Sequence, residues 1–588
     1  MSTVYAIGID FGTSNSCVTY ATYYEDMNGR LEGTPIHRPE ALTFQHKDTI
    51  ATVVFLGDGA DQQPLCGEMA EEKAVFFPEL TRSGFKLRLG RPGQSGRDAF
   101  LHSKQFLAYL RTRLADFVPL DQPAQNQRIE TIIGHPVQWS IDQREETRRA
   151  ATEAGFPNVM LEEEPLAALY SHLCDERGSF HPQPGSQILM IDMGGGTTDF
   201  ALLQLPASVE ERPISTPVDP SALVPAWGGG RTSYGGRDLD QLLLDYLSRD
   251  WDPQMVAQER SLLLREVRRF KETFSNHVRE GVDRYETMWL VGGKPLKVSL
   301  TRLEFETVAA HYITHFEALV RGALELAKVA TRQVSSLILA GGHSRWYFVD
   351  DTLKNIFPHI SRGNFTLLRH NHPEQSVARG LAYVPMVRAS GARLLAPVRK
   401  SAHSLWLHVP YGRSVLGSAA TGPGDRHEES GATSEDPVLI LPRGQQLPYS
   451  TPRPLRIAVN KLGLDAKEAT VGIQLFSSAG GTNRVALYDR VAAFERGRWE
   501  NLLKRFGTRL PWALGVDEDQ FEVWIQCEVD ENQLLTAEMV IVRYFRGKKV
   551  AIQSQKLQVA PTGSPAQTAR LQAETSPVWR PSTATTAV

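Results

Sequence analysis

The feature that most constrains the fold of this chain is an apolar strand that ends in an aspartate and a glycine turn, and it occurs twice. Residues 6–16 read AIGIDFGTSNS, and residues 187–200 read QILMIDMGGGTTDF. Each apolar run stops at glycine, which predicts a buried strand followed by a tight turn. Because Asp10 and Asp192 end their strands at matching places, we expect duplicated halves that face each other across a cleft.

Two further apolar runs of the same form lie at residues 130–137 and 335–342, and both stop at glycine or proline. Helical patterns lie between the strands, for example over residues 140–153 and 261–276. Strands that alternate with helices predict an α/β fold with covered sheets. This pattern extends to about residue 390.

After residue 403 the pattern changes to short alternating runs such as SLWLHV, PVLILP, LRIAV, VGIQLF, FEVWIQCEV and EMVIVRYF, which predict an antiparallel β module. A polar, Gly/Pro-rich stretch at residues 418–437 predicts a disordered loop, and residues 498–506 predict a helical insert. We therefore expect an α/β domain at 1–388, a linker at 389–402, a β-sandwich at 403–560 and a disordered tail at 561–588.

Composition excludes several classes of protein. The net charge of −3 does not favour nucleic acid or an anionic membrane as a partner. The four cysteines lie far apart and form no C-x-x-C pair, so we expect buried thiols rather than zinc sites or disulfides. With no leader and no long apolar run, we expect a soluble cytoplasmic protein.

The two glycine turns have the chemistry of a phosphate site. Glycines after a strand let backbone N–H groups point outward as a nest of donors for phosphate oxygens. Asp10 and Asp192 would repel phosphate unless a cation lies between them, and Mg²⁺ suits oxygen ligands and retained waters. Hydroxyl donors come from Thr13, Ser14, Thr197 and Thr198. The alternative for either turn alone is an ordinary turn, and neither the P-loop nor the dinucleotide-binding glycine pattern occurs.

A third glycine turn, LAGGHSRW at residues 339–346, follows another apolar strand. Gly341 and Gly342 would let a flat base approach, and Arg345 is placed to stack on it. The alternative is a plain strand-to-helix turn with a surface arginine.

Together these stretches are similar to the actin-like ATPases, and most of all to the Hsp70 chaperone branch. IGIDFGTSNS resembles the first phosphate motif of that family, IDMGGGTTDF its second, and LAGGHSRW its adenosine motif. The stretches at 134–156, 162–170, 233–247 and 268–276 resemble further family segments in family order. The resemblance covers about the first 390 residues and implies a two-lobed actin-like ATPase domain.

The resemblance implies a slow ATPase that binds ATP or ADP with Mg²⁺, where Asp10 and Asp192 hold the metal through waters. The catalytic residues that it implies are Lys86, Glu164, Asp192, Thr197 and Asp199. The nucleotide-binding residues that it implies are Gly12, Thr13, Ser14, Asn15, Gly194, Gly195, Gly196, Thr197, Thr198, Gly235, Gly236, Arg268, Lys271, Ser275, Gly341, Gly342 and Arg345. Taken alone, Lys86 would be a solvated surface lysine and Glu164 part of a solvated acidic turn.

The β module resembles the substrate-binding sandwich of the family in LPRGQQLPYS (441–450) and DENQLLTAEMVIVRY (530–544), which implies an unfolded or extended polypeptide as partner. Four features depart from the family. Arg268 stands where the family has a glutamate, the linker lacks its aspartates, Met160 stands near a basic residue that meets J-domain partners, and no helical lid follows. A J-domain partner is therefore not expected, whereas a nucleotide-exchange factor fits the resemblance.

Two functions follow from these patterns. The first is an Hsp70-like chaperone in which Mg-ATP binding and hydrolysis control polypeptide binding by the β module. The second is a nucleotide-gated scaffold for one dedicated partner protein, which the missing lid and altered linker favour. A small-molecule kinase or an actin-like filament would explain neither the β module nor the order of the motifs.

Overall fold

The computed structural model describes residues 2–27, 31, 37–45, 47–57, 64–91, 93–137, 139–175, 185–205, 214–218, 224, 234–360, 365–389, 398–401, 404–408, 438–442, 445–452, 455–458, 474–478, 485–488, 521–530, 535–545 and 548–558. The loop expected at 418–437, the helical insert expected at 498–506 and the tail expected at 561–588 lie outside these residues.

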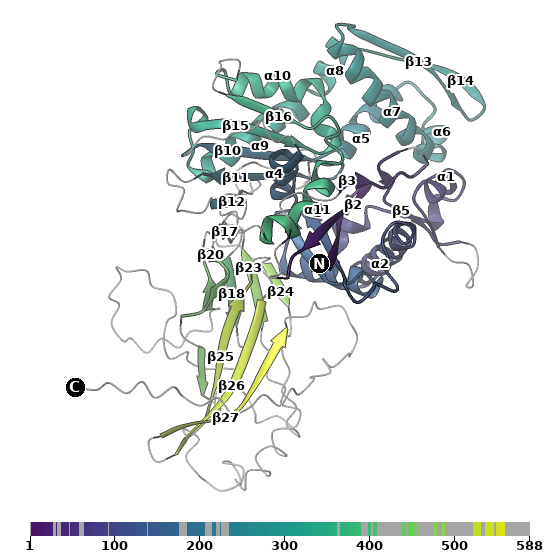
Figure 1. The fold of residues 1–588 in the computed structure, drawn as a ribbon. Coiled ribbons are helices and arrows are strands. Elements are labelled where there is room, and N and C mark those ends of the chain that lie inside the picture. Colours follow the sequence, from purple (N-terminus) through teal and green to yellow (C-terminus); the bar gives the residue numbers. More distant parts are fainter. Residues whose placement is uncertain are drawn as a thin grey trace.

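Two mixed sheets with one strand order form the α/β part of the molecule (Figure 1). The first sheet has the order β3-β2-β1-β8-β9, and the second contains the matching order β12-β11-β10-β15-β16. In each, the central strand pairs antiparallel with the next strand of the chain and parallel with a later one. The two sheets confirm the α/β class, and their common order agrees with the duplication expected from the two Asp-glycine stretches.

The strands of the first sheet are β1 (Ser2–Asp10), β2 (Asn15–Glu25), β3 (His37–Ala41), β4 (Ile50–Ala51), which pairs with β2, β8 (Gln127–His135) and β9 (Val159–Glu163). The strands of the second are β10 (Gln187–Met193), β11 (Thr198–Gln204), β12 (Ile214–Val218), β15 (Val334–Ala340) and β16 (Thr366–Arg369), and the sheet continues into β17 (Val398–Lys400) and β20 (Gln446–Leu447). We call the first sheet with its helices the first lobe and the second sheet with its helices the second lobe.

Helices cover both sheets, as the apolar strands require. The helices of the first lobe are α1 (Glu68–Phe76), α2 (Gln94–Leu114) and α3 (Ile141–Glu153). Those of the second are α5 (Gly236–Leu247), α6 (Pro253–Gln258), α7 (Arg260–Arg279), α8 (Arg302–Val308), α9 (Ala310–Ala327) and α10 (Tyr347–Ile356). The helices predicted at 140–153 and 261–276 are α3 and α7, and Ser140 begins α3 with a reciprocal pair of hydrogen bonds to Gln143.

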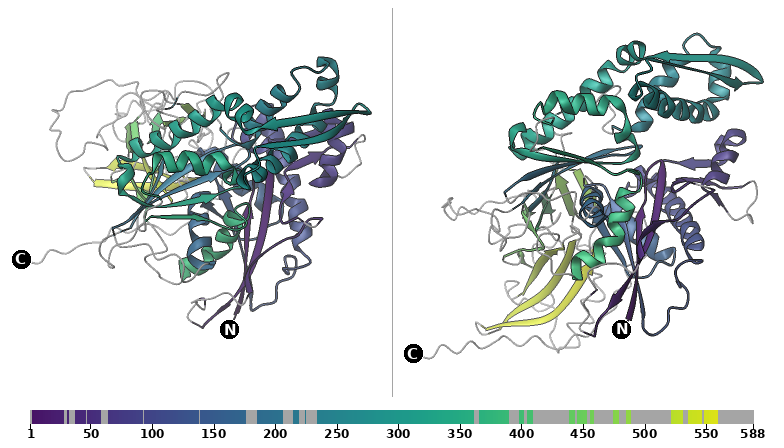
Figure 2. Two further views of the ribbon diagram at one scale, coloured as in Figure 1. Left: turned by 90° about the horizontal axis from the view of Figure 1, so that it is seen from above. Right: turned by 45° about the horizontal axis from the view of Figure 1, so that its top comes forward.

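Helices α4 (Glu164–Asp175) and α11 (Ser376–Ala389) lie between the two lobes (Figure 2). Their apolar side chains share one buried cluster with β1 of the first sheet and β10 of the second. The helices approach closely at Gly380, where a Cβ atom would lie 1.6 Å from the carbonyl oxygen of Ala167. This contact admits no side chain, and the two lobes therefore meet through closely packed backbone.

Smaller elements extend the lobes. A sheet of β5 (Val53–Phe55), β6 (Leu65–Cys66) and β7 (Thr81–Ser83) packs with α1, and β13 (Arg284–Val291) and β14 (Lys294–Thr301) form a hairpin. Single 3₁₀ turns are η1 (Pro78–Leu80), η2 (Phe85–Arg88), η4 (Thr331–Gln333) and η5 (Gly342–Arg345). Among the described helices, none combines the length and apolar character that a membrane span needs. The four cysteines are free and buried, as expected.

The C-terminal strands form two sheets whose described pairs are antiparallel, as predicted. One contains β18 (Ser404–His408), β19 (Val438–Leu441), β23 (Gln474–Ser478) and β24 (Val485–Tyr488). The other contains β21 (Tyr449–Ser450), β22 (Leu455–Ala458), β25 (Phe521–Val529), β26 (Leu535–Phe545) and β27 (Lys548–Gln558). Their packing into one sandwich stays a prediction, as do the domain bounds.

The segment expected as a linker contributes a strand. Within residues 389–402, β17 pairs parallel with β12 of the second lobe and antiparallel with β20 of the C-terminal region. The second sheet thereby extends from the α/β part into the β module.

Candidate functional site

The two glycine turns lie against each other at the boundary of the lobes. We call residues 11–14, between β1 and β2, the first turn, and residues 194–197, between β10 and β11, the second turn. A Cβ atom on Gly195 would lie 2.2 Å from the Oγ of Ser14, and one on Gly196 would lie 2.8 Å from the Cγ2 of Thr13. Bare glycine backbone is therefore required for the turns to meet.

The carboxylates of Asp10, Glu164, Asp192 and Asp199 lie close to one another beside these turns. Burial and the charge of Glu164 raise the pKa of Asp10 to about 7, against the opposing effect of Lys86. Burial, followed by the charges of Glu164, Asp10 and Asp199, raises the pKa of Asp192 well above its ordinary value. Aspartates from both lobes thus share one low-dielectric region that favours a bound cation.

Lys86 supplies one positive charge to this group. It lies in η2, is 3% exposed, and its Nζ donates to the Oε1 of Glu164 at 2.9 Å. The ammonium also lies 5.0 Å from the ring centroid of Trp139. Glu164 is the first residue of α4 and is buried. Neither residue is on the solvated surface. The catalytic roles that the family resemblance implies for them stay predictions.

The residues present fit a magnesium ion and a polyphosphate. Within the described ranges, no group of three or more His, Cys, Asp or Glu side chains is arranged to chelate a metal. The Oγ of Ser14 is buried and has no hydrogen-bond partner among the described residues. An unpaired buried hydroxyl at the first turn suits a phosphate oxygen, whereas Asn15, the first residue of β2, is exposed.

Backbone hydrogen bonds from the start of helix α5 hold the second turn in place. The carbonyl oxygens of Gly194 and Gly195 accept hydrogen bonds from the backbone N–H groups of Gly236 and Arg237, at 3.1 and 2.8 Å. The Oγ1 of Thr198 donates to the carbonyl of Tyr234 at 2.9 Å, so this hydroxyl serves the fold of the turn.

Glycines at the ends of the turns are needed for close contacts. A Cβ atom on Gly12 would lie 1.9 Å from the carbonyl oxygen of Asn15. One on Gly235 would lie 2.8 Å from the carbonyl carbon of Gly196. Thr197 is half-buried, and Asp199 is buried directly across the β10–β11 ladder from Asp192.

On helix α7, the predicted nucleotide-binding side chains are joined to α5. The Nζ of Lys271 lies 2.6 Å from the Oδ1 of Asp240 and donates to the carbonyl of Gly236 at 3.1 Å. Arg268 lies 3.6 Å from Asp240 and also 3.6 Å from Glu71 of α1 in the first lobe. Ser275 accepts a hydrogen bond from the backbone N–H of Tyr347.

The third turn packs its backbone on the second strand-end aspartate. Gly341 has φ 75°, and a Cβ atom there would lie 2.5 Å from the Oδ1 of Asp192. Gly342 begins η5. The guanidinium of Arg345 is 46% exposed, bonds the carbonyl of Asn371 and lies 3.3 Å from Glu374. The predicted stacking of Arg345 on a base stays a prediction.

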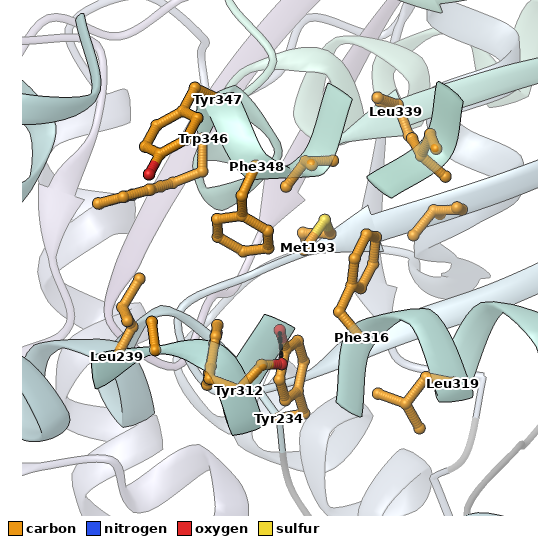
Figure 3. Packing of buried hydrophobic residues seen from close by; sticks show 14 of the residues in the cluster. Met193, Tyr234, Leu239, Tyr312, Phe316, Leu319, Leu339, Trp346, Tyr347 and Phe348 are labelled. Atoms are coloured by element: carbon orange, nitrogen blue, oxygen red, sulfur yellow. Dashed lines mark hydrogen bonds between the residues drawn. The ribbon is translucent and has the colours of Figure 1, made fainter. Parts of the chain in front are cut away.

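An aromatic cluster beneath these turns supports the second lobe (Figure 3). The rings of Tyr234 and Tyr312 stack with centroids 4.2 Å apart. The hydroxyl of Tyr312 lies 3.0 Å from the carbonyl of Gly235 and 2.9 Å from the Nε2 of His343. Burial, then the charge of Lys271, lowers the pKa of His343 well below its ordinary value.

Sequence reasoning missed several side chains that build this site, notably Asp240, Arg237 and His343. Each lies within or beside a stretch already singled out, because Arg237 and Asp240 follow Gly-Gly in SYGGRDLD and His343 follows Gly-Gly in LAGGHSRW. A charged residue directly after a glycine pair at a helix start was the available signal.

Comparison with known proteins gives consistent results. Residues 102–393 match the family model described as Hsp70 protein. Chaperone protein DnaK of Thermoplasma volcanium is 27% identical over 355 residues, which cover 58% of this chain and 52% of that protein. Chaperone protein DnaK of Endomicrobium trichonymphae is 29% identical over 353 residues, which cover 58% of this chain and 51% of that protein. The chain thus spans about half the length of these curated relatives.

Proposed function

The chain belongs to the Hsp70 family, and from that premise we propose that it is a slow ATPase whose nucleotide state controls polypeptide binding by the C-terminal β module. The observation that carries the proposal is the buried Lys86–Glu164 pair beside strand-end aspartates of both lobes. Relatives that are themselves named as chaperones support the polypeptide-binding half.

In this proposal each residue acts on phosphate, metal or water. Asp10 and Asp192 would hold Mg²⁺, which would supply positive charge against the phosphate oxygens. Lys86, held by Glu164, orients the attacking water from a buried position. The unpaired Oγ of Ser14 and the glycine backbone of the second turn bind phosphate oxygens.

The strand β17 supports coupling of the two parts of the chain. It links β12 of the ATPase part to β20 of the β module through backbone pairs, including Ser215 with Arg399 and Arg399 with Leu447. A displacement of β12 in the second sheet would therefore displace β20 of the β module through the paired strand β17. Coupling then depends on continuous backbone hydrogen bonds and not on the acidic linker side chains that this chain lacks.

The test is Mg-dependent ATP binding and turnover, with and without an unfolded polypeptide. Thr197→Ala is expected to keep ATP binding and lose turnover, whereas Asp10→Ala weakens the magnesium-dependent part of binding. Thr112→Ala, which removes an exposed hydroxyl on α2, is the matched control and leaves both unchanged. Absence of nucleotide binding would overturn the ATPase, and absence of any stimulation by polypeptide would overturn the chaperone role.

One observation favours the second function, a nucleotide-gated scaffold for a dedicated partner. At the place where the family meets J-domain partners, the guanidinium of Arg388 lies 3.1 Å from the sulfur of Met160 and 3.9 Å from Glu162. The positive charge of Arg388 thus contacts residues of its own chain at the place where a J-domain partner would bind. Affinity capture from native extract separates the two functions, because a chaperone returns many substoichiometric proteins and a scaffold returns one at equal stoichiometry.

A further inference from the structure

Arg237 lies where both turns meet the segment that precedes Lys86. It is the second residue of α5, and its backbone N–H donates to the carbonyl of Gly195 in the second turn at 2.8 Å. Its side chain reaches across the lobe boundary, where Nη2 donates to the carbonyl of Thr13 in the first turn, also at 2.8 Å. A Cβ atom on Gly84 would lie 2.8 Å from its Nη1. One residue therefore holds a hydrogen bond to each turn.

Among the described residues Arg237 forms no ion pair, although the more distant carboxylates of Asp240, Asp238 and Glu71 act to raise its pKa. In the part of the chain that the structure describes, no carboxylate lies within ion-pair distance of Arg237, although Arg268 of the same lobe has two. Burial, then the charge of Arg268, lowers the pKa of Arg237 to about 10, so the group stays protonated at neutral pH. A partly buried cation that bonds a backbone carbonyl of a proposed phosphate turn is costly for stability alone.

We propose that Arg237 is a positioning residue that holds the first turn in register with the second, so that a nucleotide polyphosphate meets both turns already assembled. The inference rests on the proposed ATPase function and deepens it. Its physical basis is preorganisation, because a turn that is ordered before the ligand arrives does not lose that conformational freedom on binding.

The first test compares Arg237→Gln and Arg237→Lys with the natural protein. Hydrogen exchange of the amides at residues 11–16 is measured without nucleotide, and dissociation constants are measured for Mg-ATP and Mg-ADP. We expect Arg237→Gln to accelerate exchange at the first turn and to weaken both nucleotides about 10-fold, the size of one charged hydrogen bond. Arg237→Lys keeps the charge and a donor, so it should restore at least half of the lost affinity on a logarithmic scale.

The control is Arg269→Gln, because Arg269 is an exposed arginine of α7 that pairs only within its own helix, with Glu266, among the described residues. It should change neither exchange at the first turn nor affinity. A purely structural role for Arg237 predicts a different result, in which the melting temperature falls while Lys and Gln behave alike.

Gly84→Ala disturbs the same guanidinium without changing the arginine, and it serves where Arg237→Gln does not fold. The new methyl group would displace Nη1, so we expect the same faster exchange and weaker binding as in Arg237→Gln. Because Gly84 has φ 62°, alanine there also strains the backbone, and the melting temperature measures that cost separately. Combined with Arg237→Gln, it should add no further loss of affinity if it acts through this side chain. A fully additive double variant would contradict the proposal.

The failure of this inference differs from the failure of the proposed function. If the natural protein binds no Mg-nucleotide, the proposed function is wrong and the inference is overturned with it. If the natural protein binds nucleotide and Arg237→Gln leaves exchange and affinity unchanged, the inference alone is overturned.

Discussion

The two lobes share a strand order but differ in the balance of charge around their buried lysines. In the first lobe, Lys86 pairs with Glu164 and faces the further carboxylates of Asp10 and Asp192. In the second, Lys271 pairs with Asp240, and Arg268 adds a second cation to the same carboxylate. Duplicated strands thus fix where a turn lies, whereas the side chains packed around it decide what it attracts.

This contrast suggests different roles for the residues around Lys86 and around Lys271 in the proposed site. The excess of carboxylates around the first lysine favours a metal ion and positioned water, whereas around the second the cations of Lys271 and Arg268 are balanced by the carboxylates of Asp240 and Glu71. The turns also differ, because the first carries the hydroxyls of Thr13 and Ser14, whereas the second has three consecutive glycines before Thr197 and is held by α5. Removing Lys86 from its pair with Glu164, and separately Lys271 from its pair with Asp240, measures how much each pair contributes to stability and turnover.

The largest expected effect is that of Lys86→Met. It leaves buried carboxylates without their cation, which costs about 3–5 kcal/mol of unfolding free energy, and we expect at least a 100-fold loss of ATP turnover. Lys271→Met should cost less, because Arg268 remains 3.6 Å from Asp240. Urea unfolding and single-turnover hydrolysis measure the two quantities. Equal destabilisation by both variants would contradict the charge asymmetry, and adding Glu164→Gln to Lys86→Met should restore stability but not turnover.

A smaller effect is expected where the turns touch. Gly195→Ala places a methyl group on the Oγ of Ser14, 2.2 Å away, so the turns must separate. The overpacking should cost about 1–3 kcal/mol, most of it as weaker Mg-ATP binding, measured by titration calorimetry. Thr112→Ala, at an exposed position on α2 outside the proposed site, is the control. Similar affinities of the two variants would show that contact between the turns is irrelevant to binding.

The smallest expected effect is on the pH dependence of the unfolding free energy, through His343 beside Lys271 in the second lobe. His343 has its pKa lowered by burial and by Lys271, so it is neutral in the folded state. Below its unfolded pKa the unfolded chain takes up a proton that the folded chain does not, so stability falls as pH falls, by up to about 1.4 kcal/mol per pH unit. His343→Gln should flatten the unfolding free energy between pH 7 and 5. Thr112→Ala, which removes an exposed hydroxyl on α2, should leave the slope unchanged, and an unchanged slope in His343→Gln would refute the argument.

Much of the fold could be predicted because its signals are local. The strand ends at Asp10 and Asp192 follow from apolar runs cut by glycine, and the start of α3 follows from the Ser140–Gln143 capping pattern. The C-terminal runs predicted as strands are strands in an antiparallel arrangement. These features depend on neighbours in the chain, which a sequence displays directly.

The candidate site was less predictable because its contacts span long separations. Lys86, whose isolated interpretation was a solvated surface lysine, is buried against Glu164, 78 positions later. Arg237 was not singled out, since its bond to Thr13 joins residues 224 positions apart. The hydroxyl of Thr198 donates to the carbonyl of Tyr234, a contact that the sequence did not reveal, and the predicted role of Thr198 in phosphate binding stays a prediction.

By itself, the sequence determined the α/β class, the two matched strand–Asp–glycine turns and the family resemblance, because strand and turn preferences and short motifs are written in consecutive residues. Only the tertiary structure decided that the turns touch, that each lobe buries a lysine–carboxylate pair in surroundings with a different balance of charge, and that β17 carries the second sheet toward the β module. Those outcomes depend on packing, which brings side chains and strands that are distant in the sequence within a few ångströms of one another. Burial then strengthens the electrostatic interactions between the charged groups and shifts their pKa values.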